Sequence, residues 1–169
     1  VGAEDDPSLV ETLLAQAVRA AGTFAPAAEQ DDLLARIGEA CWGAAVAPGS
    51  DLQLVRVRAA VSGLLDADLV TGLLDGSTVP EGLVVDAELR WHVVRRLAAR
   101  GLLGEDAVAE ELARDRTASG QLQAEAALAS LPDADVKERS WAALIFGASA
   151  STRDATPATI GAAKLVPSA

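Results

Sequence analysis

The chain has 169 residues, of which half are hydrophobic but only 3 % are aromatic, and its formal net charge is −11. This length suffices for one domain with a real hydrophobic core. The acidic balance disfavours nucleic acid and anionic membrane surfaces as partners, because both need clustered Lys and Arg. The sequence shows no signal-peptide pattern and no apolar run near the roughly 20 residues of a membrane span, so we expect a cytoplasmic protein.

Ala, Leu and Val supply most of the apolar surface. Ala and Leu are strong helix formers, and long stretches lack the alternation that strands show, so we predict an all-α fold. The chain begins at Val1 rather than at Met. We therefore expect a fragment or a processed product of a larger protein.

Two helices are predicted in the first 49 residues. Ser8 and Glu11 form a capping-box pattern, so the first helix is predicted to start at Ser8 and to end at Gly22. The second helix is predicted to hold Pro26 in its first turn and to end at the Pro-Gly pair at 48–49. In the first helix, the apolar residues expected to face the core are Leu9, Val10, Leu13, Leu14, Ala17 and Val18.

Two further helices are predicted between residues 50 and 76. Ser50 or Asp51 is expected to cap the first, whose apolar positions extend to Leu65. Two consecutive Val-Arg pairs in it resemble strand alternation, but the helical pattern continues beyond them, so we interpret the segment as helix. A short helix at 68–74 is stopped by Asp-Gly at 75–76, and a loop containing proline follows.

The stretch from Asp86 to Trp141 is the most informative part of the sequence. Its pattern predicts a helix at 86–100, a Gly turn at 101–104, a helix at 105–116, a Thr/Ser/Gly break at 117–120 and two helices parted by Pro132. Asp133 or Asp135 is expected to start the last helix. The residues expected to face inward are Leu122, Ala126, Leu128 and Ala129 on the third helix, and Val136, Ser140, Trp141, Leu144 and Ile145 on the fourth.

Arg90 interrupts the apolar face of the 86–100 helix. An unpaired guanidinium in that position would cost several kcal/mol. We predict that Arg90 pairs with Asp115 or, failing that, with Glu111, and so ties two helices together. A second interpretation makes Arg90 or Arg116 a cationic lining for a peptide carboxylate.

The sequence offers no catalytic, cofactor-binding or metal-ligating cluster, and we assign no residue to any of these roles. His92 falls on the polar face of its helix, where we predict a solvated surface histidine. A zinc site needs three or four ligands, whereas this chain has one His and one distant Cys. Cys41 has no partner for an internal disulfide and is interpreted as a small core residue. Trp91 and Trp141 are interpreted as core fillers.

Helices of roughly 12 to 16 residues with short breaks are typical of antiparallel hairpins, which stack into an α-solenoid. The sequence shows no strict repeat period. We place the helical-repeat domain at residues 1–147. Residues 148–169 are rich in Ala, Ser, Thr and Pro, and we predict a low-complexity, disordered tail there.

Several motifs of the central stretch resemble one enzyme family. They are Leu89-Arg90-Trp91, Leu-Ala-Ala-Arg-Gly at 97–101, Glu-Leu-Ala-Arg-Asp-Arg-Thr-Ala-Ser-Gly at 111–120, the Ala-rich segment 124–129, Pro132, Lys137 and Trp141. Together they are similar to the C-terminal helical domain of M1-family aminopeptidases, most of all to aminopeptidase N of actinobacterial type. The Asp-Arg-Thr-x-x-Gly element, followed by the Ala-rich segment, Pro and Lys-x-x-x-Trp, is moderately specific.

The resemblance implies a HEAT-like superhelix at the end of a zinc exopeptidase. In that family the domain forms a lid or bowl over the active site, admits peptide N-termini and holds distal parts of the peptide. The zinc lies in a separate thermolysin-like domain with a His-Glu-x-x-His helix. The implied partners are therefore that catalytic domain and the peptide substrate, with zinc in the missing domain and no cofactor in this fragment.

These observations favour a non-catalytic domain of a metallo-aminopeptidase, inactive by itself, that shapes peptide access. The alternative is a stand-alone helical-repeat adaptor that binds a peptide or a partner helix in its groove. An independent enzyme is the third hypothesis. A fragment of a larger protein is also expected to expose an apolar flank and to self-associate.

Overall fold

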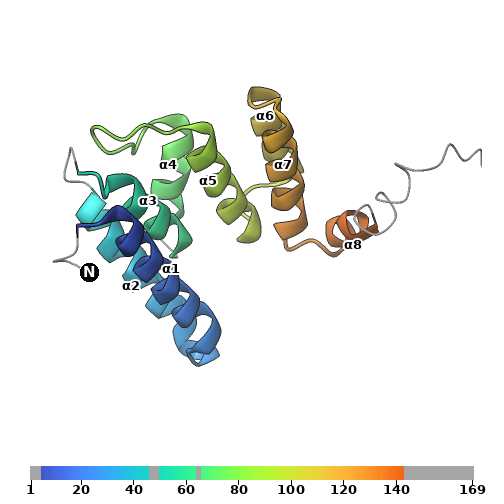
Figure 1. The fold of residues 1–169 in the computed structure, drawn as a ribbon. Helices are drawn as coiled ribbons and strands as arrows, with labels where there is room; N and C mark the ends of the chain where they lie inside the picture. Colours follow the sequence, from blue (N-terminus) through green and yellow to red (C-terminus); the bar gives the residue numbers. More distant parts are fainter. Residues whose placement is uncertain (1–4, 46–49, 64–65, 143–169) are drawn as a thin grey trace, which may run out of the picture.

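A computed structural model describes residues 5–45, 50–63 and 66–142, and these ranges contain helices and connecting segments but no strand (Figure 1). This confirms the all-α prediction for the described part of the chain. None of these helices combines the length and hydropathy needed to cross a bilayer. In chain order the helices are α1 (Pro7–Phe24), α2 (Ala27–Ala45), α3 (Gln53–Ser62), α4 (Ala67–Asp75), α5 (Ala87–Ala99), α6 (Glu105–Arg114), α7 (Ala118–Ser130) and α8 (Ala134–Ala142).

The helices follow one another across the molecule, and α5 connects its two halves (Figure 1). Helices α1, α2 and α3 contact one another, and α3 also contacts α5. Helix α5 further contacts α4, α6 and α7, and α7 contacts α6 and α8. The superhelical stacking of hairpins stays a prediction, and the boundary at residue 147 and the tail at 148–169 lie outside the described residues.

Helix α5 contributes to three hydrophobic clusters. The first cluster contains residues of all five helices from α1 to α5. The second contains residues of α5, α6 and α7, and the third contains residues of α5 and α8 together with Leu131 at the end of α7. One helix can serve all three because residues three or four apart share a face while their neighbours point elsewhere. Trp91 is 2 % exposed, so its predicted role as a core filler is confirmed. Helix α5 supplies Leu89, Val93 and Leu97 to the first cluster, Trp91 and Val94 to the second, and Ala98 to the third.

The first helix starts earlier than predicted. Asp6 is its N-cap, and its Oδ1 accepts hydrogen bonds from the backbone N–H groups of Ser8 and Leu9 at 2.9 and 3.1 Å. Pro7 occupies the first helical position, where a fixed φ and a missing N–H cost nothing. Ser8 is therefore already inside α1, and the predicted capping box is wrong.

Two further boundaries differ from the prediction. Helix α1 passes through Gly22 and ends before Ala25, because the following proline holds Ala25 in extended backbone with ψ 152°. At the start of α3, Leu52 occupies the N-cap position without a side-chain hydrogen bond. Ser50 is close by, and its Oγ accepts the N–H of Leu52 at 3.2 Å. Neither Ser50 nor Asp51 therefore caps α3.

Other predicted boundaries are confirmed. Helix α4 ends before Gly76, whose φ of 90° is in the left-handed region that favours glycine. Asp86 caps α5, and its Oδ1 accepts the N–H of Leu89 at 2.8 Å. Asp133 precedes α8 in the same way, because its Oδ1 accepts the N–H of Val136 at 2.9 Å.

The buried face of α7 is rotated from the predicted one. Its buried residues are Gly120, Ala124 and Ala127, whereas Leu122 is 67 % exposed. Helix α7 packs on α5, and small residues let two helix backbones approach more closely than Leu does. The prediction is wrong for Leu122 and Ala129, which are exposed, whereas Leu128 packs against the second and third clusters as predicted.

Candidate functional site

A polar junction joins α5 to α6 through Arg90. Its Nε and Nη2 donate to the two carboxylate oxygens of Glu111, both at 2.7 Å, and its Nη1 donates to the carbonyl of Leu74 at 2.9 Å. A bidentate charge-assisted pair is the strong form of an ion pair, and the hydrogen bond to Glu111 raises the pKa of Arg90. The predicted tie between helices is present with the second choice of partner, Glu111, and the first choice, Asp115, is wrong.

Asp115 is engaged by other partners. Its Oδ2 accepts the indole N–H of Trp91 at 2.8 Å, and its Oδ1 accepts the hydroxyl of Thr117 at 2.7 Å. The hydrogen bonds from Thr117 and then from Trp91 lower the pKa of the Asp115 carboxyl. Because this carboxylate is fixed outside the helix, α6 ends at Arg114, two residues earlier than predicted.

The same junction explains the Asp-Arg-Thr-x-x-Gly motif. Thr117 caps α7, because its Oγ1 accepts the N–H of Gly120 at 3.0 Å. A Cβ on Gly120 would collide with the backbone carbonyl of Asp115 and approach its carboxylate. Ser119 and Gly120 lie inside α7, so the predicted break at 117–120 is wrong and the real one is shorter. The motif thus builds a tight helix-to-helix turn.

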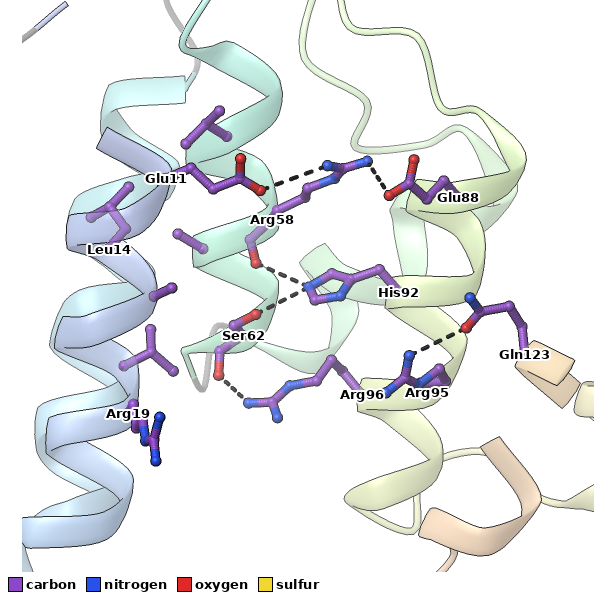
Figure 2. A pocket seen from close by; sticks show the side chains of 14 residues that line it. Glu11, Leu14, Arg19, Arg58, Ser62, Glu88, His92, Arg95, Arg96 and Gln123 are labelled. Atoms are coloured by element: carbon purple, nitrogen blue, oxygen red, sulfur yellow. Dashed lines mark hydrogen bonds and ion pairs between the residues drawn. The ribbon is translucent and has the colours of Figure 1, made fainter. Parts of the chain in front are cut away.

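A groove of about 460 Å³ lies among α1, α3, α5 and α7 (Figure 2). Small-molecule sites in proteins range over about 300–1,000 Å³, so this volume is large enough for a small ligand. Helices α1 and α5 both pack on α3, and they supply the facing walls. The apolar lining residues are Leu14, Ala15, Val18, Val55 and Ala59, and the polar ones are Glu11, Arg19, Arg58, Ser62, Glu88, His92, Arg95, Arg96 and Gln123.

His92 lies in the middle of this groove and is partly buried, so the predicted solvated histidine is wrong. Its Nε2 is 3.1 Å from both the carbonyl oxygen of Arg58 and the hydroxyl oxygen of Ser62. Because a carbonyl only accepts, we assign a hydrogen to Nε2. Burial lowers the pKa of His92, and three neighbouring arginines lower it further, whereas the hydrogen bond to the Arg58 carbonyl opposes them.

Arg58 at one end of the groove is paired with two carboxylates (Figure 2). Its guanidinium lies 3.1 Å from Glu88 and 4.0 Å from Glu11. Both glutamate side chains are well exposed, so each pair is worth at most about 1 kcal/mol. The positive charge of Arg58 is nevertheless compensated locally.

The other end of the groove holds three arginines without a carboxylate partner among the described residues. Arg95 donates to the amide oxygen of Gln123 at 3.2 Å, and Arg96 donates to the backbone carbonyl of Ser62. Arg19 lines the opposite wall on α1 (Figure 2). Burial lowers the pKa of Arg96, and the charges of Arg100 and Arg95 lower it further.

The sequence analysis did not identify this groove. Arg19 and Arg58 lie on helices far from the Arg-Arg pair at 95–96, and no spacing rule brings them together. The Arg-Arg pair at 95–96 on a polar helix face was the one feature of the sequence that could have pointed to a basic groove. Arg90 and Arg116, the two arginines considered for a peptide carboxylate, lie outside the groove. Arg116 is exposed, and its Nε donates to a carbonyl of α6 at 3.2 Å.

No three His, Cys, Asp or Glu side chains gather into a possible metal site within the described ranges. Cys41 belongs to the first hydrophobic cluster, which confirms its predicted place in the core. Burial raises the pKa of the Cys41 thiol, against a smaller opposing effect of the Arg56 charge. The side chain of Trp141 lies outside the described residues.

Comparison with known proteins gives two matches. A family profile described as the ERAP1-like C-terminal domain matches residues 1–164. Over 150 residues the chain is 37 % identical to Aminopeptidase N of Streptomyces lividans, and this alignment covers 86 % of the chain. It covers only 18 % of that relative, so the chain spans less than a fifth of the relative's length.

Proposed function

Because this chain belongs to the ERAP1-like C-terminal domain family, we propose that it forms part of the enclosure over the active site of a zinc metallo-aminopeptidase. The chain is the C-terminal domain of an aminopeptidase N-like protein. In the proposed M1-family parent, the catalytic domain holds the zinc and the N-terminus of the peptide. The present domain is non-catalytic and lies opposite the catalytic domain, where it controls the access of peptides to the active site. The parent enzyme acts in the cytoplasm.

The match over residues 1–164 carries this proposal. The groove among α1, α3, α5 and α7 supports it, because apolar and polar side chains line it side by side and a peptide offers both kinds of group. The grouping of the helices around α5 supports it as well, because a row of packed helices forms a wall (Figure 1).

An apolar face between α1 and α2 is the proposed contact with the catalytic domain. Phe24 on this hairpin is 78 % exposed, and Leu9 and Leu13 on α1 are 45 % and 41 % exposed. A shallow depression of about 940 Å³ between α1 and α2 has a mostly apolar lining. Exposed apolar patches of this kind mark interaction surfaces. The same face is where the isolated chain is expected to self-associate.

Deleting this domain from the parent enzyme tests the proposal. Turnover of a single-residue aminoacyl-anilide should be retained, whereas the ratio of turnover on ten-residue peptides to turnover on the anilide should change. A second effect should be cleavage at the N-termini of folded proteins, which the intact enclosure excludes. Retained zinc and an unchanged far-UV spectrum serve as the folding control. An unchanged ratio and continued exclusion of folded proteins would contradict the proposal.

The stand-alone adaptor remains the second candidate, because an apolar face also suits a partner helix. The gene sequence upstream of Val1 distinguishes the enzyme domain from the adaptor. A reading frame that encodes His-Glu-x-x-His upstream and continues into Val1 supports the enzyme domain, whereas a start codon near Val1 supports the adaptor. Incubation of the purified chain with zinc and an aminoacyl-anilide should show no turnover, and zinc-dependent turnover would refute the non-catalytic role.

A further inference from the structure

The lining of the groove among α1, α3, α5 and α7 has a positive charge, although the whole chain carries −11. Four arginines and two glutamates line it, and neutral His92 leaves an excess of two positive charges. Both glutamates pair with Arg58. Arg58 and the two glutamates together carry −1, and the three positive charges of Arg19, Arg95 and Arg96 lie at the opposite end, so the lining as a whole has an excess of two.

Three arginine side chains gather at this end of the groove. Like charges that share a site repel, and a lining of one sign attracts counter-ions of the other. The pKa directions agree with this: burial lowers the pKa of His92 and the charges of Arg96 and Arg95 lower it further, and Arg95 also lowers the pKa of Arg96, after the larger effects of burial and Arg100. Arg96 is partly buried, so water screens its charge less than that of a surface arginine.

The donors at this end remain available to a ligand. Each guanidinium has five N–H groups. Arg95 uses one of them for the amide oxygen of Gln123, Arg96 uses one for the carbonyl of Ser62, and no hydrogen bond or ion pair engages Arg19 among the described residues. Guanidinium groups bind the planar carboxylate through two parallel hydrogen bonds.

We propose that the end of the groove between Arg19, Arg95 and Arg96 binds a small organic dicarboxylate. Its two negative charges match the excess of two positive charges in the lining. Its short hydrocarbon body has apolar partners in the same groove, among them Leu14, Val18 and Val55. Inorganic phosphate carries a similar charge but has no apolar part. The bound dicarboxylate joins α1 to α5, which both pack on α3. The dicarboxylate occupies the same groove that supports the enclosure role, but its binding to the isolated chain does not depend on that role.

Calorimetric titration of the 169-residue chain with glutarate, at constant ionic strength and pH 7.5, tests the site. We expect saturable binding of one glutarate per chain and a rise in melting temperature with glutarate concentration. Inorganic phosphate and chloride are titrated in parallel. Phosphate is expected to bind more weakly than glutarate, and chloride is expected not to saturate. Saturation by phosphate with none by glutarate would overturn the dicarboxylate assignment.

Three variants locate the site. R95A and R19A should each weaken glutarate binding about tenfold or more, because each removes charge-assisted hydrogen bonds. R36A is the matched control: Arg36 is an exposed arginine on α2, outside this groove, and its loss changes the net charge equally. R36A should bind glutarate like the unmodified chain. Because Arg19 is exposed and has no partner among the described residues, R19A leaves the fold intact. Equal affinities of R19A and R36A, or no saturation by glutarate, would refute the site.

Discussion

Two faces of α5 carry arginines in opposite situations. Arg90 on one face makes a bidentate pair with Glu111, whose side chain is only 6 % exposed. On the other face, Arg95 and Arg96 reach only an amide oxygen and a backbone carbonyl within the described part of the chain. The same residue type on one helix thus stabilises the fold in one place and leaves positive charge for a ligand in the other. The difference lies in the partners that neighbouring helices supply.

Removing the partner of Arg90 should have the largest effect. E111A leaves a mostly buried guanidinium without its carboxylate, and we expect a loss of about 3–5 kcal/mol in the free energy of unfolding. Urea unfolding measures the loss. E110A is the matched control, because Glu110 is exposed on the same helix, and it should change stability by less than about 0.5 kcal/mol. If E111A is as stable as E110A, Arg90 is not a structural tie.

The double variant R90M/E111L sharpens this comparison. It replaces both partners with apolar side chains, so no buried charge is left unpaired. Such replacements are often neutral or stabilising relative to a buried pair. We therefore expect R90M/E111L to unfold at a higher urea concentration than E111A. A double variant less stable than E111A would show that the hydrogen bond from Arg90 to the Leu74 carbonyl contributes more than the pair itself.

A substitution at the α6–α7 turn should have the second largest effect. G120A places a methyl group against the Asp115 carbonyl, and we expect a loss of about 1–3 kcal/mol because the backbone must shift. G43A is the control, since a Cβ on Gly43 in α2 meets no atom within 4 Å. It should stabilise the chain by about 0.5–1 kcal/mol. Thermal unfolding of both variants measures these changes, and equal stabilities would contradict the proposed packing.

The groove face of α5 should make stability depend on pH. The pKa of His92 is lowered in the folded chain from 6.5, so below that pH the unfolded chain binds a proton that the folded chain does not. Stability is therefore retained above pH 6.5 and lost as the pH falls, by at most about 1.4 kcal/mol per pH unit. Urea unfolding at pH 7.5 and 5.5 measures the loss.

The variant H92Q isolates this contribution. It keeps a side chain that can donate to the Arg58 carbonyl but does not titrate. We expect a smaller decrease in stability between pH 7.5 and 5.5 for H92Q than for the unmodified chain. An identical decrease in both would assign the pH dependence to other groups.

The smallest effect on stability and on glutarate binding is expected for an arginine that contacts neither face of α5. Arg116 is exposed and makes one hydrogen bond, to a carbonyl of α6. R116A should change the free energy of unfolding by less than about 0.5 kcal/mol and should leave glutarate binding unchanged. A larger loss of stability would show that Arg116 takes part in the turn built by Asp115 and Thr117.

Local sequence signals predicted most helices, but they predicted fewer of the helix boundaries and buried faces correctly. The start of the helix near Asp86 and the glycine at position 76 depend on contacts within one or two turns, so the local sequence sufficed to place them. The start of α1 was misplaced because Asp6 and Ser8 are both good caps and Pro7 decides between them. The buried face of α7 was misplaced because the close approach of α5 overrides a hydrophobicity pattern.

The sequence by itself determined the helical class and the need of Arg90 for an acidic partner, because both follow from contacts within a few residues or from the cost of a buried charge. It also determined the family resemblance, which the profile match confirms. Only the tertiary structure decided that Glu111 rather than Asp115 meets Arg90, and that arginines of α1, α3 and α5 line one groove. The physical reason is that helical periodicity assigns residues to a face, whereas helix packing decides what that face meets.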